Sequence, residues 1–316
     1  MTPNLETCPL CGSPLAPALR APDRRYATSQ MYEVWQCGEC GLGVTRMPEP
    51  TLAAESHYPD DYEPYRQISR PAGGLRRRLA ASLLGARGYP QDDALPLPRV
   101  LAAVLATIRC WTWCPPPPPP GKLLDVGCAA GAYGAALQRL GWQVVGIEPN
   151  ARAASLARAA GLEVWQNAVE ETDLPAGAFD AITLWHVLEH LDRPVAVLQR
   201  LRPALREGGL LLLETPNREG LGALLAGSYW FHLDLPRHRY HFTPTALVKT
   251  LTLAGYRLLR LQHIPNPHGF AGSLAYRLGR RNLRELPLLQ AWGWAFGIAT
   301  AALRRSDIMR AYATPV

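Results

Sequence analysis

Short apolar segments alternate with helical segments along the second half of the chain, and this alternation constrains the fold more than any other feature. Continuous apolar strands separated by helices are typical of a parallel sheet that is covered on both faces. Two later segments, 256–261 and 308–313, would add edge strands. We therefore expect an α/β, doubly wound sheet of seven strands, whose first five are Leu123–Val126, Val144–Ile147, Leu162–Trp165, Ala181–Trp185 and Leu210–Leu213.

The residues before this sheet divide into two parts. Residues 1–47 contain two cysteine pairs and several turn formers, which indicate a small module built around a site. Residues 48–120 form a connector with a short helix at 75–84 and a helical segment at 99–113. The connector ends in six prolines, 115–120, which would span roughly 19 Å as a stiff polyproline II spacer. The sheet domain then covers 121–316, with a hydrophobic insertion at about 262–306.

Composition limits the class of protein. With 316 residues, 48% apolar content and 19% charge, the chain can form a packed globular enzyme. Residues 1–10 lack the basic stretch and apolar run of a secretory signal, so we expect a cytoplasmic protein. The net charge of +7 is almost entirely due to arginine. It fits either affinity for phosphate or the codon usage of a GC-rich genome, and charge alone does not identify a partner.

The turn after the first strand predicts a cofactor site. Asp125 lies near the strand's end, and the small residues Gly127, Ala129 and Gly131 open the next helix. Small residues let the backbone approach a ligand, and a helix N-terminus offers free N–H groups. Glu148 follows Gly127 by 21 residues, at the end of the second strand, where its carboxylate can accept hydrogen bonds from ribose hydroxyls.

The details of this turn favour S-adenosylmethionine (SAM) over a nicotinamide cofactor. A dinucleotide fingerprint requires glycines at positions 127, 129 and 132, and only Gly127 is present. The pattern Asp-x-Gly-x-Gly-x-Gly is met at Asp125, Gly127 and Gly131 and departs only at Ala129. An acidic residue before the turn suits a ligand that carries an ammonium and a sulfonium group. We therefore predict SAM as the cofactor.

Five motifs in order resemble the small-molecule class I SAM-dependent methyltransferases of the ubiquinone O-methyltransferase type: 125–131, 146–149, 179–182, 187–190 and 207–214. The resemblance covers about 121–261 and implies a Rossmann-like methyltransferase sheet. It places the adenine near 167–169, although Asn167 replaces the family's usual acidic residue, and the methionine end near Trp185 and His186. The cofactor-binding residues it predicts are Asp125, Gly127, Cys128, Gly131, Tyr133, Glu148, Pro149, Asn167, Ala168, Val169, Trp185 and His186.

Two cysteine pairs predict a zinc site near the N-terminus. Cys8 and Cys11 precede Gly12, and Cys37 and Cys40 precede Gly41, so that each pair has the form of a zinc knuckle. Four thiolates make a closed tetrahedral site with no open position for chemistry. We therefore predict a structural Zn²⁺ in a zinc ribbon. A redox dithiol is the alternative interpretation of the same pairs.

Five of the eight histidines fall between 186 and 241. Ligands bind beyond the carboxyl ends of parallel strands, so residues 230–243 are expected to form a substrate loop. The zinc knuckles, cofactor domain and loop together resemble bacterial methyltransferases of sugar and polysaccharide pathways, including zinc-containing sugar-nucleotide C-methyltransferases. Those enzymes have a Glu-His pair where this chain has Arg237-His238. The resemblance makes His238 the first candidate for the general base, with His241 and His190 as competitors.

The predicted reaction is methylation of a hydroxyl of a small-molecule acceptor, namely a sugar, glycolipid or secondary metabolite. The alternatives are a ribosomal RNA methyltransferase with a zinc ribbon, a sugar C-methyltransferase and a non-catalytic SAM-binding module. Residues 1–50 carry only Arg20, Arg24, Arg25 and Arg46 as cations, so a nucleic-acid partner is not expected. Arg237 in place of the glutamate, and the lack of a second α/β domain, favour O-methylation. The sequence leaves the oligomeric state open.

A final feature is an uncharged stretch at 286–303, bracketed by Glu285 and Arg304. Its eighteen residues reach the lower limit for a membrane span, but Pro287, Gly293 and Gly297 weaken a span. The stretch could instead be a helix packed over the substrate site. A third possibility is peripheral membrane contact, with Trp292 and Trp294 at the lipid headgroups.

Overall fold

The structure is a computed structural model that describes residues 6–26, 28–47, 74–89, 91–92, 94–98, 115–280 and 287–316. The helical segment expected at 99–113 lies outside these residues. The chain divides into two compact units. The first unit comprises Met1–Pro59, Leu184–Pro203 and Leu211–Val316, and the second comprises Asp60–Thr183 and Ala204–Leu210. The domain limits expected at 47 and 120 remain predictions.

A seven-stranded sheet has the strand order β10-β11-β8-β7-β4-β5-β6. β4, β5 and β6 pair in parallel, whereas β11 pairs antiparallel with both β10 and β8. This arrangement confirms the predicted α/β fold class and each predicted strand. The strands are β4 (Lys122–Val126), β5 (Gln143–Ile147), β6 (Glu163–Trp165), β7 (Phe179–Trp185), β8 (Leu205–Pro216), β10 (Tyr256–Ile264) and β11 (Ile308–Pro315).

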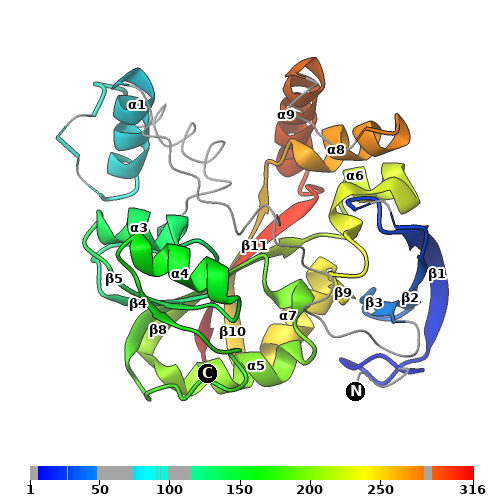
Figure 1. The fold of residues 1–316 in the computed structure, drawn as a ribbon, viewed down its shortest axis with the longest axis horizontal. Helices are drawn as coiled ribbons and strands as arrows, with labels where there is room; N and C mark the ends of the chain where they lie inside the picture. The colour runs from blue at the N-terminus through cyan, green and yellow to red at the C-terminus, as the bar shows by residue number, and fades with distance from the viewer. Residues whose placement is uncertain are drawn as a thin grey trace. The chain divides into compact units, whose positions relative to one another are not determined.

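In the second unit, the apolar residues of β4 and β5 are buried under two helices, α3 (Ala132–Gln138) and α4 (Ala151–Ala159). Both helices lie on the same side of these strands (Figure 1). The Asn150 side chain caps α4 by accepting a hydrogen bond from the Ala153 amide at 3.0 Å. The short helix expected at 75–84 is present as α1 (Gly74–Gly85). Trp142 donates to the Tyr89 hydroxyl at 2.8 Å, which ties the end of this helical segment to β5.

In the first unit, a four-stranded antiparallel sheet has the order β1-β2-β3-β9. β1 (Leu15–Pro22), β2 (Met31–Cys37) and β3 (Gly43–Arg46) come from the cysteine-containing segment and lie together in Figure 1. β9 (Tyr240–His241) comes from the histidine-rich loop and pairs with β3, with Gly43 opposite His241. The sequence analysis did not anticipate this pairing. The ribbon therefore shares a sheet with the predicted substrate loop.

The first unit also contains five helices among its described residues. The Thr243 side chain caps one of them, α7, by accepting from the Ala246 amide at 3.1 Å. Short 3₁₀ turns precede β9 at Leu188–His190, Gly227–Tyr229 and Phe231–Leu233. The five helices are α5 (Pro194–Leu201), α6 (Leu221–Ala226), α7 (Pro244–Leu253), α8 (His268–Arg277) and α9 (Pro287–Ala302).

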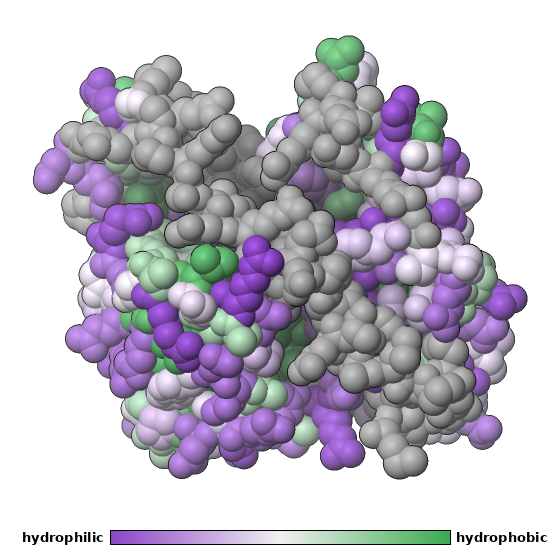
Figure 2. Space-filling view, in the orientation of Figure 1, coloured by the Kyte–Doolittle hydropathy of each residue, from purple (hydrophilic) through white to green (hydrophobic). Residues whose placement is uncertain are grey.

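Helix α9 holds most of the uncharged stretch, and its two glycines serve packing. A Cβ at Gly293 would lie 2.5 Å from the Pro267 carbonyl oxygen, and one at Gly297 would lie 2.6 Å from that of Asn266. The helix backbone therefore approaches the start of α8 closely. Leu288 and Trp292 are 80% and 70% exposed, and hydrophobic atoms show at the end of α9 in Figure 2. Within the described parts of the chain, no helix is long and apolar enough to cross a bilayer.

Candidate functional site

The turn after β4 uses left-handed backbone at three positions. Gly127, Ala129 and Gly131 have φ angles of 70°, 48° and 78°. The amides of Gly127 and Cys128 donate to the Ile147 carbonyl at 2.8 and 3.1 Å, which joins the turn to the end of β5. A Cβ at Gly131 would lie 2.8 Å from the Cα of Ala157, so only glycine lets the turn approach α4 this closely. The motif that predicted the cofactor thus forms a tight turn at the strand end.

Glu148 lies at the end of β5 and is almost fully buried. One carboxylate oxygen accepts from the Ala129 amide at 3.0 Å, and the other accepts from the Asn150 amide at 2.9 Å. Burial raises the pKa of this carboxyl, and the two amide bonds partly offset the rise. An ionised carboxylate has about four acceptor positions, so each oxygen can accept a further hydrogen bond. This geometry suits two adjacent ribose hydroxyls.

Asp125 is 2% exposed and accepts a hydrogen bond from the Thr183 hydroxyl at 2.7 Å. Burial, and to a smaller extent the charge of Glu148, raise its pKa to about 7, although the Thr183 bond opposes this. Among the residues that the structure describes, neither Asp125 nor Glu148 forms an ion pair with a cationic side chain. Two buried carboxyls without a cation favour a ligand that brings positive charge and hydroxyl groups. SAM has both, so these residues fit it.

The other predicted cofactor residues of the second unit have varied environments. Cys128 packs on β5, because a Cβ at Gly146 would lie 2.5 Å from its sulfur. Tyr133 is half-buried against the core, whereas Pro149 is exposed. The segment 167–169 follows β6 with Asn167 exposed, Ala168 half-buried and Val169 buried, and the Ala168 carbonyl accepts from the Thr172 hydroxyl at 2.8 Å. The roles of these residues in cofactor binding stay predictions.

The four cysteines of the first unit come together. Their sulfur atoms all lie within 4.8 Å of one another, with Cys8–Cys40 at 3.5 Å and Cys11–Cys37 at 3.4 Å. A tetrahedral site with Zn–S bonds of about 2.3 Å separates its sulfurs by roughly 3.8 Å. Gly12 and Gly41 follow the pairs with φ angles of 73° and 74°, as tight knuckles require. The cluster therefore fits a structural zinc ion.

His238, the first candidate base, is 6% exposed in the loop before β9. Its Nδ1 atom lies 2.9 Å from the His232 carbonyl, which can only accept, so Nδ1 donates and the neutral ring has its lone pair on Nε2. Burial, together with the charge of His190, lowers the pKa of His238 to about 4. The Nε2 atom lies 4.0 Å from a Glu189 oxygen and 3.8 Å from an Asp234 oxygen.

The two competing histidines lie beside His238. His190 places Nδ1 3.0 Å from the Arg237 carbonyl, and its ring centroid is 4.7 Å from that of His238. Burial lowers the pKa of both His190 and His241. His241 is 2% exposed, and its Nε2 atom lies 2.9 Å from the Thr45 hydroxyl. The ligand atoms of Glu189, His190 and His238 lie within 4.8 Å of one another, so this group could hold a cation.

His186, predicted to line the methionine end of SAM, follows β7 with a φ of 54°. Its two ring nitrogens lie 3.2 Å from Glu189 and 3.2 Å from Glu214. The side chain of His186 is 41% exposed, so desolvation opposes its protonation only in part, and the two carboxylates raise the pKa of the ring to about 10. The contact with His186 in turn lowers the pKa of the Glu189 carboxyl to about 2, although that carboxyl is buried. The Cζ atom of the Arg310 guanidinium lies over the ring of the preceding Trp185, 4.9 Å from the ring centroid.

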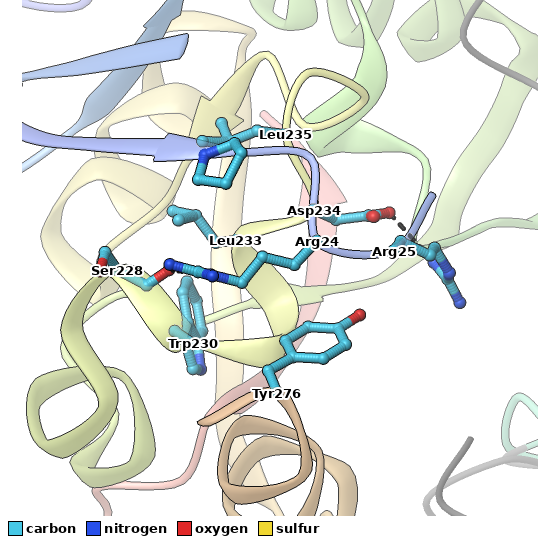
Figure 3. Close-up of a pocket in the computed structure, with 9 residues that line it drawn as sticks. Arg24, Arg25, Ser228, Trp230, Leu233, Asp234, Leu235 and Tyr276 are labelled. Carbon is cyan, nitrogen blue, oxygen red and sulfur yellow. Dashed lines mark hydrogen bonds and ion pairs between the residues drawn. The ribbon is translucent and has the colours of Figure 1, made fainter. Parts of the chain in front are cut away.

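An ion-pair network joins the ribbon to the histidine loop. Arg237 donates to Asp23 at 2.7 and 2.9 Å and to Asp234 at 2.7 Å, and Arg25 donates to Asp234 at 3.1 Å. Arg25 and Asp234 also line a cavity of about 10 Å³, room for one water (Figure 3). The sequence analysis missed Asp23, because it lies 214 residues from Arg237 and no local pattern links them.

Residues 97–261 match the family described as "Methyltransferase domain", which is slightly more than half of the chain. The chain belongs to this methyltransferase family. This methyltransferase is 35% identical over 130 residues to a ubiquinone biosynthesis O-methyltransferase of Xanthomonas oryzae pv. oryzae (strain PXO99A), covering 38% of this chain and 54% of the relative. The corresponding protein of Xanthomonas axonopodis pv. citri (strain 306) is 33% identical over 150 residues, 43% of this chain and 63% of the relative.

The methyltransferase thus spans only 54% to 63% of the length of these curated relatives. Among solved structures, a SAM-dependent methyltransferase of Thermotoga maritima, described as a possible histamine N-methyltransferase, has a TM-score of 0.46 at 15% identity. That similarity covers 77% of this chain and 92% of the other.

Proposed function

We propose that the protein is a SAM-dependent methyltransferase that methylates a hydroxyl of a small molecule, namely a sugar, a glycolipid or a secondary metabolite. The observation that carries this proposal is the pair of buried carboxyls, Asp125 and Glu148, at the ends of β4 and β5. Burial raises the pKa of each, and among the described residues no cationic side chain forms an ion pair with either. Membership of the methyltransferase family supports the same conclusion.

In this proposal, Glu148 accepts hydrogen bonds from the ribose of SAM, and Asp125 offsets positive charge at the methionine end. When bound, SAM supplies an electrophilic methyl group on a sulfonium. The backbone of the turn, whose Gly127 and Cys128 amides donate to the Ile147 carbonyl, is proposed to lie against the cofactor. Asn167, Ala168 and Val169 are proposed to contact the adenine, and Trp185 and His186 the methionine end.

His238 is proposed as the general base. As the acceptor oxygen takes the methyl group, the proton of its hydroxyl passes to Nε2 of His238, whose lone pair is placed there by the bond from Nδ1 to His232. The imidazolium that results lies 4.0 Å from Glu189 and 3.8 Å from Asp234. Both carboxylates are held ionised by cationic neighbours, and they would stabilise the new positive charge.

The relatives' name supports O-methylation, because they are called ubiquinone biosynthesis O-methyltransferases. The sugar or lipid-linked acceptor rests on the resemblance of the zinc knuckles and the histidine loop to polysaccharide-pathway enzymes. A screen with methyl-labelled SAM and with oligosaccharides, glycolipids and phenolic alcohols as acceptors decides between a sugar or lipid-linked acceptor and a phenolic one. We expect label in an ether of a sugar or glycolipid. Label found only in phenols would contradict a sugar or lipid-linked acceptor, and label on carbon would indicate C-methylation.

Two further alternatives have their own signatures. A ribosomal RNA methyltransferase would bind RNA with an affinity that falls steeply as salt rises. A non-catalytic module would bind SAM by calorimetry but transfer no label to any acceptor. Absence of SAM binding would overturn the proposal as a whole.

Peripheral membrane contact through 286–303 remains a prediction. Its described support is the exposure of Leu288, Trp292 and Leu303 on and just after α9. Flotation with anionic liposomes at low salt tests it, and a protein that stays at the bottom of the gradient would contradict it.

A further inference from the structure

The ribbon strand β3 contacts the histidine cluster with the side chain of Thr45. The Thr45 amide donates to the Arg239 carbonyl at 2.9 Å, which extends the pairing of β3 with the loop beyond β9. The Thr45 side chain is then placed between His238 and His241, with only 5% of the residue exposed. Neither the cysteine motif nor the histidine-rich segment indicated a role for this threonine. Thr45 contacts both histidines because the pairing of β3 with β9 brings it beside them.

The Thr45 hydroxyl has two partners and a single proton. It lies 2.6 Å from the His238 carbonyl oxygen and 2.9 Å from Nε2 of His241. A carbonyl oxygen can only accept, so the hydroxyl proton is donated to His238. The contact with His241 must then run the other way, with an N–H at Nε2 donating to the Thr45 oxygen. Because His241 is buried and neutral, its lone pair is on Nδ1.

Gly43, two residues before Thr45, makes room for this arrangement. It lies opposite His241 in the β3–β9 pair, and a Cβ there would lie 3.0 Å from the His241 Cβ and 3.3 Å from its Cδ2. The imidazole of His241 therefore packs on the bare backbone of the ribbon strand. The ribbon thus holds His241 by packing at Gly43 and by a hydrogen bond at Thr45.

The other two histidines have the opposite tautomer. Nδ1 of His238 donates to the His232 carbonyl, and Nδ1 of His190 donates to the Arg237 carbonyl. Both therefore have the lone pair on Nε2. The Nε2 atom of His238 also lies 4.0 Å from a Glu189 oxygen and 3.8 Å from an Asp234 oxygen. In His241, by contrast, Nε2 is the donor, and that donor bond ends on Thr45.

We infer that Thr45 is a positioning residue for the proposed methyl transfer. Its hydroxyl fixes the proton of His241 on Nε2, so that this nitrogen cannot accept a proton, and it anchors the backbone of His238, the proposed base. This inference rests on the proposed function for its catalytic meaning. Its structural content, the tautomer of His241, stands apart from any activity.

The first test measures the tautomers directly. Histidine ring ¹⁵N shifts in the zinc-loaded full chain should show protonated Nε2 for His241 and protonated Nδ1 for His238 and His190. In Thr45→Val, which removes the hydroxyl at nearly constant volume, the His241 Nε2 proton should lose its protection from exchange. Thr45→Ser should restore it. A wild-type His241 protonated on Nδ1 would overturn the inference, whether or not the protein transfers methyl groups.

The second test uses turnover of methyl-labelled SAM with an acceptor from the screen. Thr45→Val should lower kcat about tenfold, a ratio that corresponds to the free energy of about one hydrogen bond. KM and SAM affinity should change less than twofold. Thr45→Ser should recover most of the rate. Thr250→Val is the matched control, because Thr250 is equally buried in α7 and donates to the Ala246 carbonyl at 2.8 Å. Equal kcat in Thr45→Val and Thr250→Val would overturn the positioning role.

These tests separate the inference from the proposed function. If wild-type protein fails to bind SAM or transfers no methyl group, the proposed function fails while the tautomer assignment is still decided by the ring shifts. If Thr45→Val does not fold, the wild-type shifts and the Thr45→Ser variant decide the inference on their own.

Discussion

Two regions of the molecule bury carboxyl groups in opposite ways. At the ends of β4 and β5, the described hydrogen-bond donors to Asp125 and Glu148 are one hydroxyl and two amides, and burial raises the pKa of both carboxyls. In the histidine cluster, the side chains of Glu189 and Asp234 are 1% and 6% exposed, yet His186, Arg25 and Arg237 hold their pKa values far below the usual range. Within the described residues, the first region supplies no cation to its carboxyls, as the proposed SAM site requires, whereas the second region compensates its charge internally.

The largest effect should come from removing zinc. Zinc ligation can contribute on the order of 10 kcal/mol to a small module, so chelation or Cys37→Ser should unfold the ribbon. Because β3 pairs with β9, hydrogen exchange should increase both in residues 7–46 and in 238–243. Calorimetry should show cofactor affinity in the second unit nearly unchanged, and added zinc should reverse the loss. Continued protection of 238–243 in the zinc-free protein would mean that the loop does not depend on the ribbon.

The next effect concerns His238, the proposed general base in the histidine cluster. His238→Ala should lower kcat by about 100- to 10,000-fold, because a positioned base contributes on this scale, and leave SAM affinity within twofold. Steady-state kinetics with the screened acceptor measures the first and calorimetry the second. His263→Ala, at a histidine of β10, serves as a control. A loss below about fivefold would transfer the role to His190 or His241.

A smaller effect is expected in the binding site. Glu148→Gln should weaken SAM binding by roughly 1.5 to 3 kcal/mol for each charged hydrogen bond lost, about 10- to 150-fold. Calorimetric titration with SAM and with S-adenosylhomocysteine measures this change. Glu207→Ala, at an exposed glutamate of β8, should bind as the wild type does. Unchanged affinity in Glu148→Gln would remove Glu148 from the cofactor site.

The smallest effect is a pH dependence from Asp125. Its folded pKa of about 7 exceeds the reference value of 3.8, so protonation stabilises the ligand-free fold, and that contribution is lost as pH rises from about 4 to 7. SAM, a cation, should prefer the ionised form, and its affinity should fall about tenfold from pH 8 to pH 6. Titration calorimetry across this range checks the slope. Asp125→Asn should abolish this pH dependence of SAM affinity. An equal slope in that variant would mean that another group causes the dependence.

The second unit follows closely from local sequence. Short intervals along the chain separate the strand ends, the glycines at 127 and 131, and the acidic residue after β5. Parallel strands bring their carboxyl ends together at one edge of the sheet. The cysteine pairs are equally local, because each knuckle is five residues long. In both cases the chemistry lies in residues whose spacing along the chain already determines their spacing in three dimensions.

The histidine cluster could be anticipated only in part. The concentration of histidines between 186 and 241 indicated a site, and the three candidate bases do lie together. Their tautomers, however, depend on three backbone carbonyls and on Thr45, which lies 193 residues from His238. The pairing of β3 with β9 is two residues long on the loop side, too short to leave a strand pattern in the sequence.

The sequence by itself thus determined the sheet, the cofactor turn and the cysteine knuckles, because each is encoded by residues close together in the chain. Only the tertiary structure decided which charges are compensated. Asp23 and Arg25 of the ribbon meet Asp234 and Arg237 of the loop across more than 200 residues. A buried ion pair depends on where distant backbones are packed together, and no periodicity or spacing within either segment records its partner.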